Sequence, residues 1–246
     1  MPNPRTRRVS AAIVTLAGVF LVSTAGAELP GENADWTLQK EADDIRIYTI
    51  EHPDSRFRAF KAVALLDAPI ANVMAVMINP ESCLEWVHGC SDSYAFGEGD
   101  FFDRYAYSVN DMPWPVSDRD YVIRIRTQGS EETGEIVMNL NATPDRQEEK
   151  AGLVRVDRSD TLYRFIPEGD QTHMVWVQHT DPNGALPGWL VNSLVVDIPL
   201  NSMEKLEEVA NRPRYQNHEL VFDDSGQLVA VEAEAQTGDD EKEGNR

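Results

Sequence analysis

The sequence has few cysteines, few basic residues and no long apolar run after its first 22 residues. It contains two cysteines, and 22 lysines and arginines against 42 aspartates and glutamates, for a net charge of −20 at pH 7. Such an excess of acid argues against a nucleic-acid partner and against electrostatic docking on anionic lipid headgroups. No later segment approaches the roughly 18 apolar residues of a membrane-spanning helix. We therefore expect a soluble protein, and a monomer.

Motifs for catalysis and for metal or cofactor binding are also missing. The five histidines form no H-x-x-x-H or H-E-x-x-H pair, and Cys83 and Cys90 have no second cysteine pair nearby. A zinc site is therefore not expected. The sequence contains no G-x-S-x-G, P-loop or G-x-G-x-x-G motif either. These absences predict a protein that is not an enzyme and holds no cofactor.

The N-terminus has the three parts of a secretory signal peptide over residues 1–27. Arg5, Arg7 and Arg8 supply the basic part, residues 11–22 are apolar, and Ala25-Gly26-Ala27 is a small-residue cleavage site. Cleavage after Ala27 would change the net charge to −23, because it removes three arginines and no acid. The alternative is a membrane anchor that is never cut. We expect export to the periplasm or the exterior, with a soluble mature protein.

The two cysteines bear on the same expectation. In an oxidising compartment Cys83 and Cys90 could form a disulfide, and the alternative is two separate thiols. Sequence alone does not supply the separation of their Cα atoms, which would decide.

The rest of the chain divides by composition. Residues 28–35 form a polar leader, 36–214 a single domain, and 215–231 a short C-terminal extension. Residues 232–246 are acidic and nearly free of apolar side chains, which predicts a disordered tail. A tail of this kind would also suit an interaction module that binds a basic partner.

Alternating apolar and polar residues predict an antiparallel meander in the domain. Two early strands are expected around Ile45–Ile47 and Phe57–Phe60, followed by a helix that begins at Pro69. The later strands are expected at 91–95, 102–108, 120–127, 135–142, 152–165 and 172–178. From Leu186 to about Asn211 the apolar spacing is helical, and Pro199 should kink that helix or break it in two.

A bent sheet closed by an amphipathic helix can enclose an apolar cavity at the seam. Pattern alone favours a filled core over such a cavity. Three motifs add to the pattern. Trp36 is followed by Asp44-Ile45-Arg46-Ile47-Tyr48, and residues 113–121 read Pro-Trp-Pro-Val-Ser-Asp-Arg-Asp-Tyr. Residues 181–192 begin with Asp-Pro-Asn-Gly and continue to Leu-Pro-Gly-Trp-Leu-Val-Asn.

These motifs, in this order and spacing, resemble the START family, the steroidogenic acute regulatory protein-related lipid transfer domains. The resemblance implies an α+β helix-grip (START/Bet v 1-like) fold, a curved antiparallel sheet closed by a long C-terminal helix around an apolar cavity. It implies binding of one lipid, sterol or other apolar ligand, and transfer of that ligand through transient membrane contact is a further expectation. The alternative is an aromatase/cyclase-like enzyme of the same fold superfamily, acting on a hydrophobic polyketide-type substrate.

The resemblance also implies ligand-binding residues. Asp92 and Arg119 are expected to pair inside the cavity and orient a polar group of the ligand, the alternative being a structural ion pair. Trp114, between two prolines, is expected in the cavity or at its mouth, or else packed within its loop. Leu190, Leu194 and Ile198 should form the inward face of the closing helix, touching either a ligand or ordinary core.

Overall fold

The computed structural model describes residues 29–184 and 186–234. The signal peptide expected over 1–27 and most of the acidic tail therefore lie outside the described residues. The strands are β1 (Thr37–Ala42), β2 (Ile45–Ile50), β3 (Ala59–Leu66), β4 (Cys90–Phe96), β5 (Asp103–Asn110), β6 (Arg119–Gly129), β7 (Ile136–Ala142), β8 (Val154–Arg155), β9 (Arg158–Glu168), β10 (Gln171–Asp181), β11 (His218–Phe222) and β12 (Leu228–Ala233).

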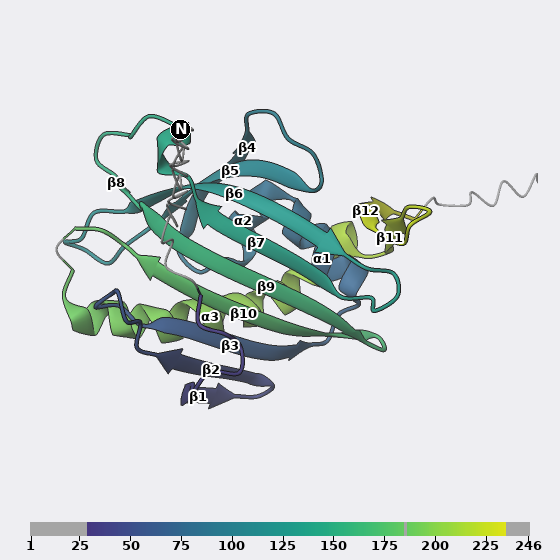
Figure 1. The fold of residues 1–246 in the computed structure, drawn as a ribbon, viewed down its shortest axis with the longest axis horizontal. Helices are drawn as coiled ribbons and strands as arrows, with labels where there is room; N and C mark the ends of the chain where they lie inside the picture. Colours follow the sequence, from purple (N-terminus) through teal and green to yellow (C-terminus); the bar gives the residue numbers. More distant parts are fainter. Residues whose placement is uncertain (1–28, 185, 235–246) are drawn as a thin grey trace, which may run out of the picture.

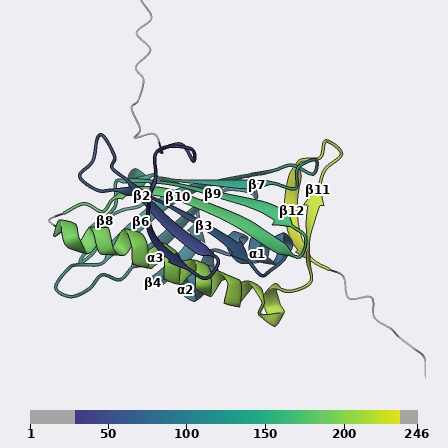
Figure 2. The same ribbon diagram turned by 90° about the horizontal axis from the view of Figure 1, so that it is seen from below.

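The helices are α1 (Ile70–Ile78), α2 (Cys83–Trp86) and α3 (Gly188–Ala210), with short 3₁₀ turns η1 (Pro80–Ser82), η2 (Pro144–Arg146) and η3 (Pro213–Tyr215). The large sheet has the strand order β1-β2-β3-β10-β9-β7-β6-β5-β4, and every neighbouring pair along it is antiparallel. The helices lie on one face of this sheet, and α3 runs along it (Figures 1 and 2). The expected helix-grip fold is confirmed.

Strand formation follows from the alternation of buried and exposed side chains. In β3 and β9 every second residue is buried, which places one row of side chains toward the helices and the other outward. Between the sheet and the helices lies the main core, in which Met74 of α1 and Met203, Leu206 and Val209 of α3 are fully buried. Burying these side chains is what attaches α3 to the sheet.

Pro199 lies inside α3, which continues as one helix from Gly188 to Ala210. The expectation that proline would break this helix in two is therefore wrong. Pro199 removes one backbone donor, but Leu200 and Met203 beyond it are buried in the core and keep the chain helical.

Two other boundaries differ from the sequence-based prediction. The strand expected over 152–165 is two strands, because Val154 and Arg155 pair with β6 in parallel before the chain turns into β9. At the C-terminus, β11 and β12 form a hairpin whose Leu228 is buried against the main core, next to α1 (Figure 1). This hairpin reaches Ala233, so the first two residues of the expected tail belong to a strand.

Candidate functional site

A cavity of about 340 Å³ opens between the N-terminal half of α3 and the loop ends of the sheet. We call it the outer chamber. Its apolar wall comes from α3, through Val191, Leu194, Val195 and Ile198. Its polar wall includes four ionisable side chains, Arg58, His88, Asp111 and Arg119.

A second cavity of about 180 Å³, the inner chamber, lies between α2 and the middle of the sheet. Trp86 of α2 meets Tyr163 and Trp176 of the sheet edge-on there, with ring centroids 6.2 and 6.0 Å apart. The described residues that line this chamber are all uncharged, and they include the apolar side chains of Met77, Ile123, Ile125, Met138 and Leu140. An apolar group of a ligand can therefore lie here without facing a buried charge.

The two chambers are contiguous. Asn110 of β5, Tyr121 of β6 and Gln178 of β10 line both chambers, and Ile198 of α3 does so from the opposite side. We call the three polar residues the waist of the tunnel. Strand register explains their common orientation: Asn110 pairs with Arg119, and Tyr121 follows Arg119 by two residues, so these side chains share the inner face. The two-residue spacing between Arg119 and Tyr121 is visible in the sequence, and strand alternation would have placed Tyr121 on the same face as Arg119. Motif matching alone missed this residue.

Gln178 is fixed by a row of hydrogen bonds along the inner face of β10. Trp176 Nε1 donates to Gln178 Oε1 at 2.9 Å, and Gln178 Nε2 donates to Thr180 Oγ1 at 2.8 Å. Thr180 Oγ1 lies 2.8 Å from Ser159 Oγ of β9. Because each member of the row is held by the next, the Gln178 amide has one orientation toward the tunnel.

Burial controls the protonation of the tyrosines in the tunnel. It raises the pKa of Tyr121 to about 12, against an opposing effect of Arg119, and it also raises the pKa of Tyr163. Both phenols are therefore protonated at physiological pH and can donate a hydrogen bond.

Arg119 lies at the rim of the outer chamber and is only 3% exposed. Its guanidinium donates to the carbonyl oxygens of Pro182 at 3.1 Å and Asn183 at 2.9 Å, and to that of Ser117. The expected pair with Asp92 does not form. Asp92 is exposed, and its nearest cation is Lys150, 4.0 Å away. Arg119 therefore holds the turn between β10 and α3 through backbone carbonyls.

A β-bulge explains the position of Asp92. The register of β4 shifts between Cys90 and Asp92, which places Asp92 opposite Val109 of β5. Val109 lies on the outer face of the sheet, in a cluster with Tyr107 and Val122. Since cross-strand partners share a face, Asp92 points away from the cavity.

Sequence reasoning also missed the carboxylate that follows Arg119. Asp120 points to the outer face and is 1% exposed, and its Oδ2 accepts from Arg155 Nη2 at 2.8 Å and from the Tyr107 hydroxyl at 3.1 Å. Arg155 also donates to three carbonyl oxygens of the segment 144–148. The two residues thus lie on opposite faces of the sheet. Arg119 lies at the cavity rim, and Asp120 forms a buried structural ion pair.

Trp114 is 92% exposed, and Trp189 at the start of α3 is 73% exposed. Neither side chain lines the two chambers. Both border a third cavity of about 460 Å³, which we call the surface groove and which also includes Pro113, Pro187 and Arg119. Trp114 is therefore not a residue of either chamber, because its side chain, in the loop between β5 and β6, faces solvent. It lies beside the mouth, since Pro113 and Arg119 border both this groove and the outer chamber.

The three α3 residues expected to contact a ligand differ in position. Leu194 and Ile198 line the outer chamber, and Ile198 also lines the inner one. Leu190 instead packs in a small cluster with Phe57, Leu186 and Val191 and borders the surface groove. Helical geometry accounts for the split, since the lining positions 191, 194, 195 and 198 form one stripe and Leu190 lies at its edge.

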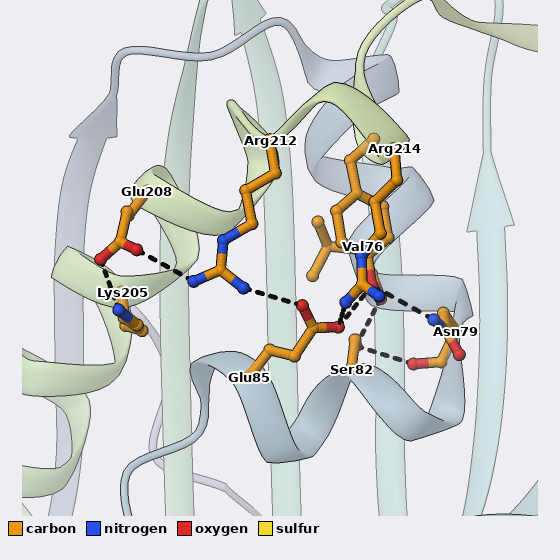
Figure 3. Close-up of polar contacts among 9 residues, drawn as sticks. Val76, Asn79, Ser82, Glu85, Lys205, Glu208, Arg212 and Arg214 are labelled. Carbon is orange, nitrogen blue, oxygen red and sulfur yellow. Dashed lines mark hydrogen bonds and ion pairs between the residues drawn. The ribbon is translucent and has the colours of Figure 1, made fainter.

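The wall of the inner chamber is fixed from two sides at α2. A disulfide joins Cys83 of α2 to Cys90 of β4. Glu85 of α2 accepts from Arg212 at 3.0 Å and from the Tyr215 hydroxyl at 2.7 Å, and it pairs with Arg214 (Figure 3). These contacts connect α2, which carries Trp86, to β4 on one side and to the segment that follows α3 on the other.

Within residues 29–184 and 186–234, no three side chains of the metal-binding types are grouped, and no helix is long and apolar enough to cross a membrane. A curved sheet, one long helix and a two-chamber tunnel between them define the class of helix-grip ligand-binding domains.

Comparison with known proteins makes the family specific. The START domain profile matches residues 27–215, so this chain belongs to the START domain family. An uncharacterized protein of Pseudomonas aeruginosa is 31% identical over 179 residues, covering 72% of this chain and 88% of its own. Phosphatidylcholine transfer protein of Rattus norvegicus is 27% identical over 165 residues, 65% of this chain and 76% of its own.

Solved structures agree with this assignment. A STAR-related lipid transfer protein fragment from Xanthomonas axonopodis superposes with a TM-score of 0.66 at 28% identity, covering 72% of this chain and 99% of the fragment. Human StAR-related lipid transfer protein 5 has the same fold, with a TM-score of 0.66 at 16% identity over 73% of this chain and 88% of its own.

Proposed function

We propose that this protein binds one lipid molecule in the two-chamber tunnel and carries it between membranes without altering it chemically. The observation that carries the proposal is the pair of adjoining cavities, bordered by Leu194 and Ile198 of α3 on one side and by the inner face of the sheet on the other. An apolar enclosed site with a few fixed polar groups is typical of ligand-binding pockets. The names of the rat and Xanthomonas relatives, which are lipid transfer proteins, support the same function.

We further propose that Trp114 and Trp189 contact the membrane during loading and release. Exposed tryptophans are unusual on a surface that otherwise faces water, and they favour the interface between lipid headgroups and acyl chains. Both lie beside the mouth of the outer chamber. Docking there would bring the tunnel to the bilayer through apolar contact, which suits a chain with a net charge of −20.

The test is transfer of a fluorescent phospholipid between vesicles of neutral phosphatidylcholine. The double variant Trp114→Ser/Trp189→Ser should transfer about ten-fold more slowly, since each indole loses apolar contact with the membrane, while equilibrium lipid binding stays the same. Leu84→Ser, which removes an exposed apolar side chain from α2, is the control and should transfer normally. Equal rates for the double variant would contradict the docking surface.

The same experiment separates carriage from catalysis. The transferred lipid should have an unchanged mass when it is recovered from the acceptor vesicles. A changed mass would instead show that the protein alters its ligand chemically, which would contradict simple carriage. Absence of both binding and transfer, across a panel of phospholipids and sterols, would defeat the proposed function.

Export to the periplasm or the exterior is also a proposal. It is supported by the signal-like residues 1–27 and by the Cys83–Cys90 disulfide, which persists in oxidising compartments. N-terminal sequencing of the protein isolated from its host should give Glu28 as the first residue. Recovery of the intact N-terminus from the cytoplasm would contradict export.

A further inference from the structure

The polarity of the tunnel changes along its length. Outer-chamber residues include the ionisable side chains of Arg58, His88, Asp111 and Arg119, whereas the described residues of the inner chamber are uncharged. Between them lies the waist of Asn110, Tyr121 and Gln178, which is polar and neutral. From the mouth inward, the lining is thus charged, then neutral and hydrogen-bonding, then mainly apolar.

The waist has unused hydrogen-bonding capacity. Within the described residues, the Asn110 amide and the Tyr121 hydroxyl make no side-chain hydrogen bond, and both face the chambers. Gln178 Nε2 uses one of its two hydrogens on Thr180, which leaves the other for the tunnel. The three side chains therefore present about four N–H and O–H donors at one level of the tunnel.

Donors lining an apolar tunnel require a partner, because a desolvated polar group without one is costly. Tyr121 is a protonated phenol and both amides are neutral, so the waist suits an uncharged oxygen acceptor better than an anion. A charged group of the ligand is better matched in the outer chamber, where Arg58, Arg119 and Asp111 lie.

We propose that the waist binds the carbonyl oxygen of an acyl ester, and that the ligand is an ester-linked glycerolipid with a charged or zwitterionic headgroup. This inference rests on the lipid-binding function proposed above and names its ligand class. The headgroup occupies the outer chamber, the ester lies among Asn110, Tyr121 and Gln178, and an acyl chain enters the inner chamber beside Trp86. A sterol fits less well, because its single hydroxyl would leave either the charged mouth or the waist unmatched.

The experiment compares two phosphatidylcholines with the same headgroup and chain lengths, one ester-linked and one ether-linked. The ether lipid lacks both carbonyl oxygens and is otherwise nearly the same shape. Binding is measured by displacement of a fluorescent phospholipid from the full chain. The wild-type protein should bind the ester lipid about ten-fold more tightly, the equivalent of one or two hydrogen bonds to neutral groups.

Variants then locate this preference. Tyr121→Phe and Gln178→Leu should each lower the preference for the ester lipid to about two-fold, with little change in affinity for the ether lipid. Tyr105→Phe is the matched control: Tyr105 lies on β5 opposite Arg124, on the outer face of the sheet, and its loss should leave the ester preference intact. Cooperative unfolding by urea checks that each variant is folded.

Three results would overturn the inference. Equal wild-type affinity for ester and ether lipids would remove the ester site while leaving lipid binding established. Tighter binding of a sterol than of the ester lipid would assign the tunnel to another ligand class. Failure to bind either phospholipid would reject this inference, and binding of no lipid of any class would reject the proposed function as well.

Discussion

The two halves of α3 are held in different ways. Beyond Pro199, the side chains of Met203, Leu206 and Val209 are fully buried in the main core. Before it, Leu194, Val195 and Ile198 face the tunnel, and Leu190 and Val191 belong to a small cluster with Phe57. One half of the helix is an anchor and the other is a cavity wall, so truncating a side chain beside the tunnel should weaken the fold less than truncating one beyond it.

Polar contacts strengthen the same contrast. At the C-terminal end, Arg212, Arg214 and Tyr215 bind Glu85 (Figure 3). Nearby, Glu207 Oε2 accepts from the Asp67 backbone N–H at 2.9 Å. The N-terminal cap, Pro187, makes no side-chain hydrogen bond to the helix. Between the halves, Pro199 has no N–H, so the Val195 carbonyl lacks its usual helical donor.

The largest difference is expected from two leucine truncations in this helix. Leu206→Ala should lower the free energy of unfolding by about 3–5 kcal/mol, because it opens a cavity in packed core. Leu194→Ala should cost about 1–2 kcal/mol, since its side chain already borders an open chamber. Urea denaturation of both variants measures the difference. Equal losses would mean that the tunnel wall is packed as tightly as the core.

A smaller loss is expected from the network around Glu85. Glu85→Gln should lower the free energy of unfolding by about 1–2 kcal/mol, because it leaves Arg212 and Arg214 without their carboxylate while both remain partly exposed. Glu81→Gln, an exposed neighbour on η1, is the control and should change stability by less than about 0.5 kcal/mol. If the two variants behave alike, the network contributes nothing beyond surface charge.

Hydrogen exchange should show the contrast within the native protein. Amides of residues 190–198 should exchange about ten-fold faster than those of 200–210, because local opening is easier where fewer apolar contacts are broken. Uniform protection along α3 would argue that the helix opens as one unit. Addition of a bound phospholipid should slow exchange in the first half and leave the second unchanged.

The smallest expected effect is a pH dependence of local stability, confined to the N-terminal half of α3. His179 stacks on His52 with ring centroids 3.9 Å apart, beside the loop that carries Phe57. Burial, and then the neighbouring His52, lower the pKa of His179, while a hydrogen bond with the Phe57 backbone, and then Asp160 and Asp181, oppose this. The unfolded chain therefore takes up the proton first, and stability falls as pH drops below about 6.5.

Amide hydrogen exchange measured at pH 7.5 and pH 5.5, and corrected for the intrinsic exchange rate at each pH, tests this pH dependence. Acid should accelerate exchange of residues 190–198 in the wild type, and His179→Gln should reduce the acceleration. Unchanged exchange in the wild type at pH 5.5 would contradict it.

Much of the fold could be predicted from the sequence, because alternation and helical spacing reflect which side chains are buried. The strand expected over 120–127, for example, is the centre of β6. The break after Arg155 could not be predicted, since it depends on parallel pairing with β6, a contact between segments distant in the chain. Pro199 misled for a similar reason, because burial of its neighbours outweighs its effect on the backbone.

The site was less predictable. Leu194 and Ile198 follow from helical spacing, and Arg119 from its motif, yet Asp92 points outward because one bulge reverses the face of β4. Trp114 is large and apolar, which favours burial, but its loop projects into solvent. The waist residues Asn110 and Gln178 carry no motif. Their proximity is a product of strand register and curvature, which one sequence does not fix.

The central claim is that the tunnel holds a lipid, and blocking the tunnel tests it most directly. Ala106 lines the inner chamber, whereas its cross-strand partner Ala95 is exposed at the edge strand β4. Native mass spectrometry after incubation with phospholipid vesicles should show one lipid bound to the wild type and to Ala95→Trp, and none to folded Ala106→Trp. Equal occupancy in both tryptophan variants would contradict binding in the tunnel.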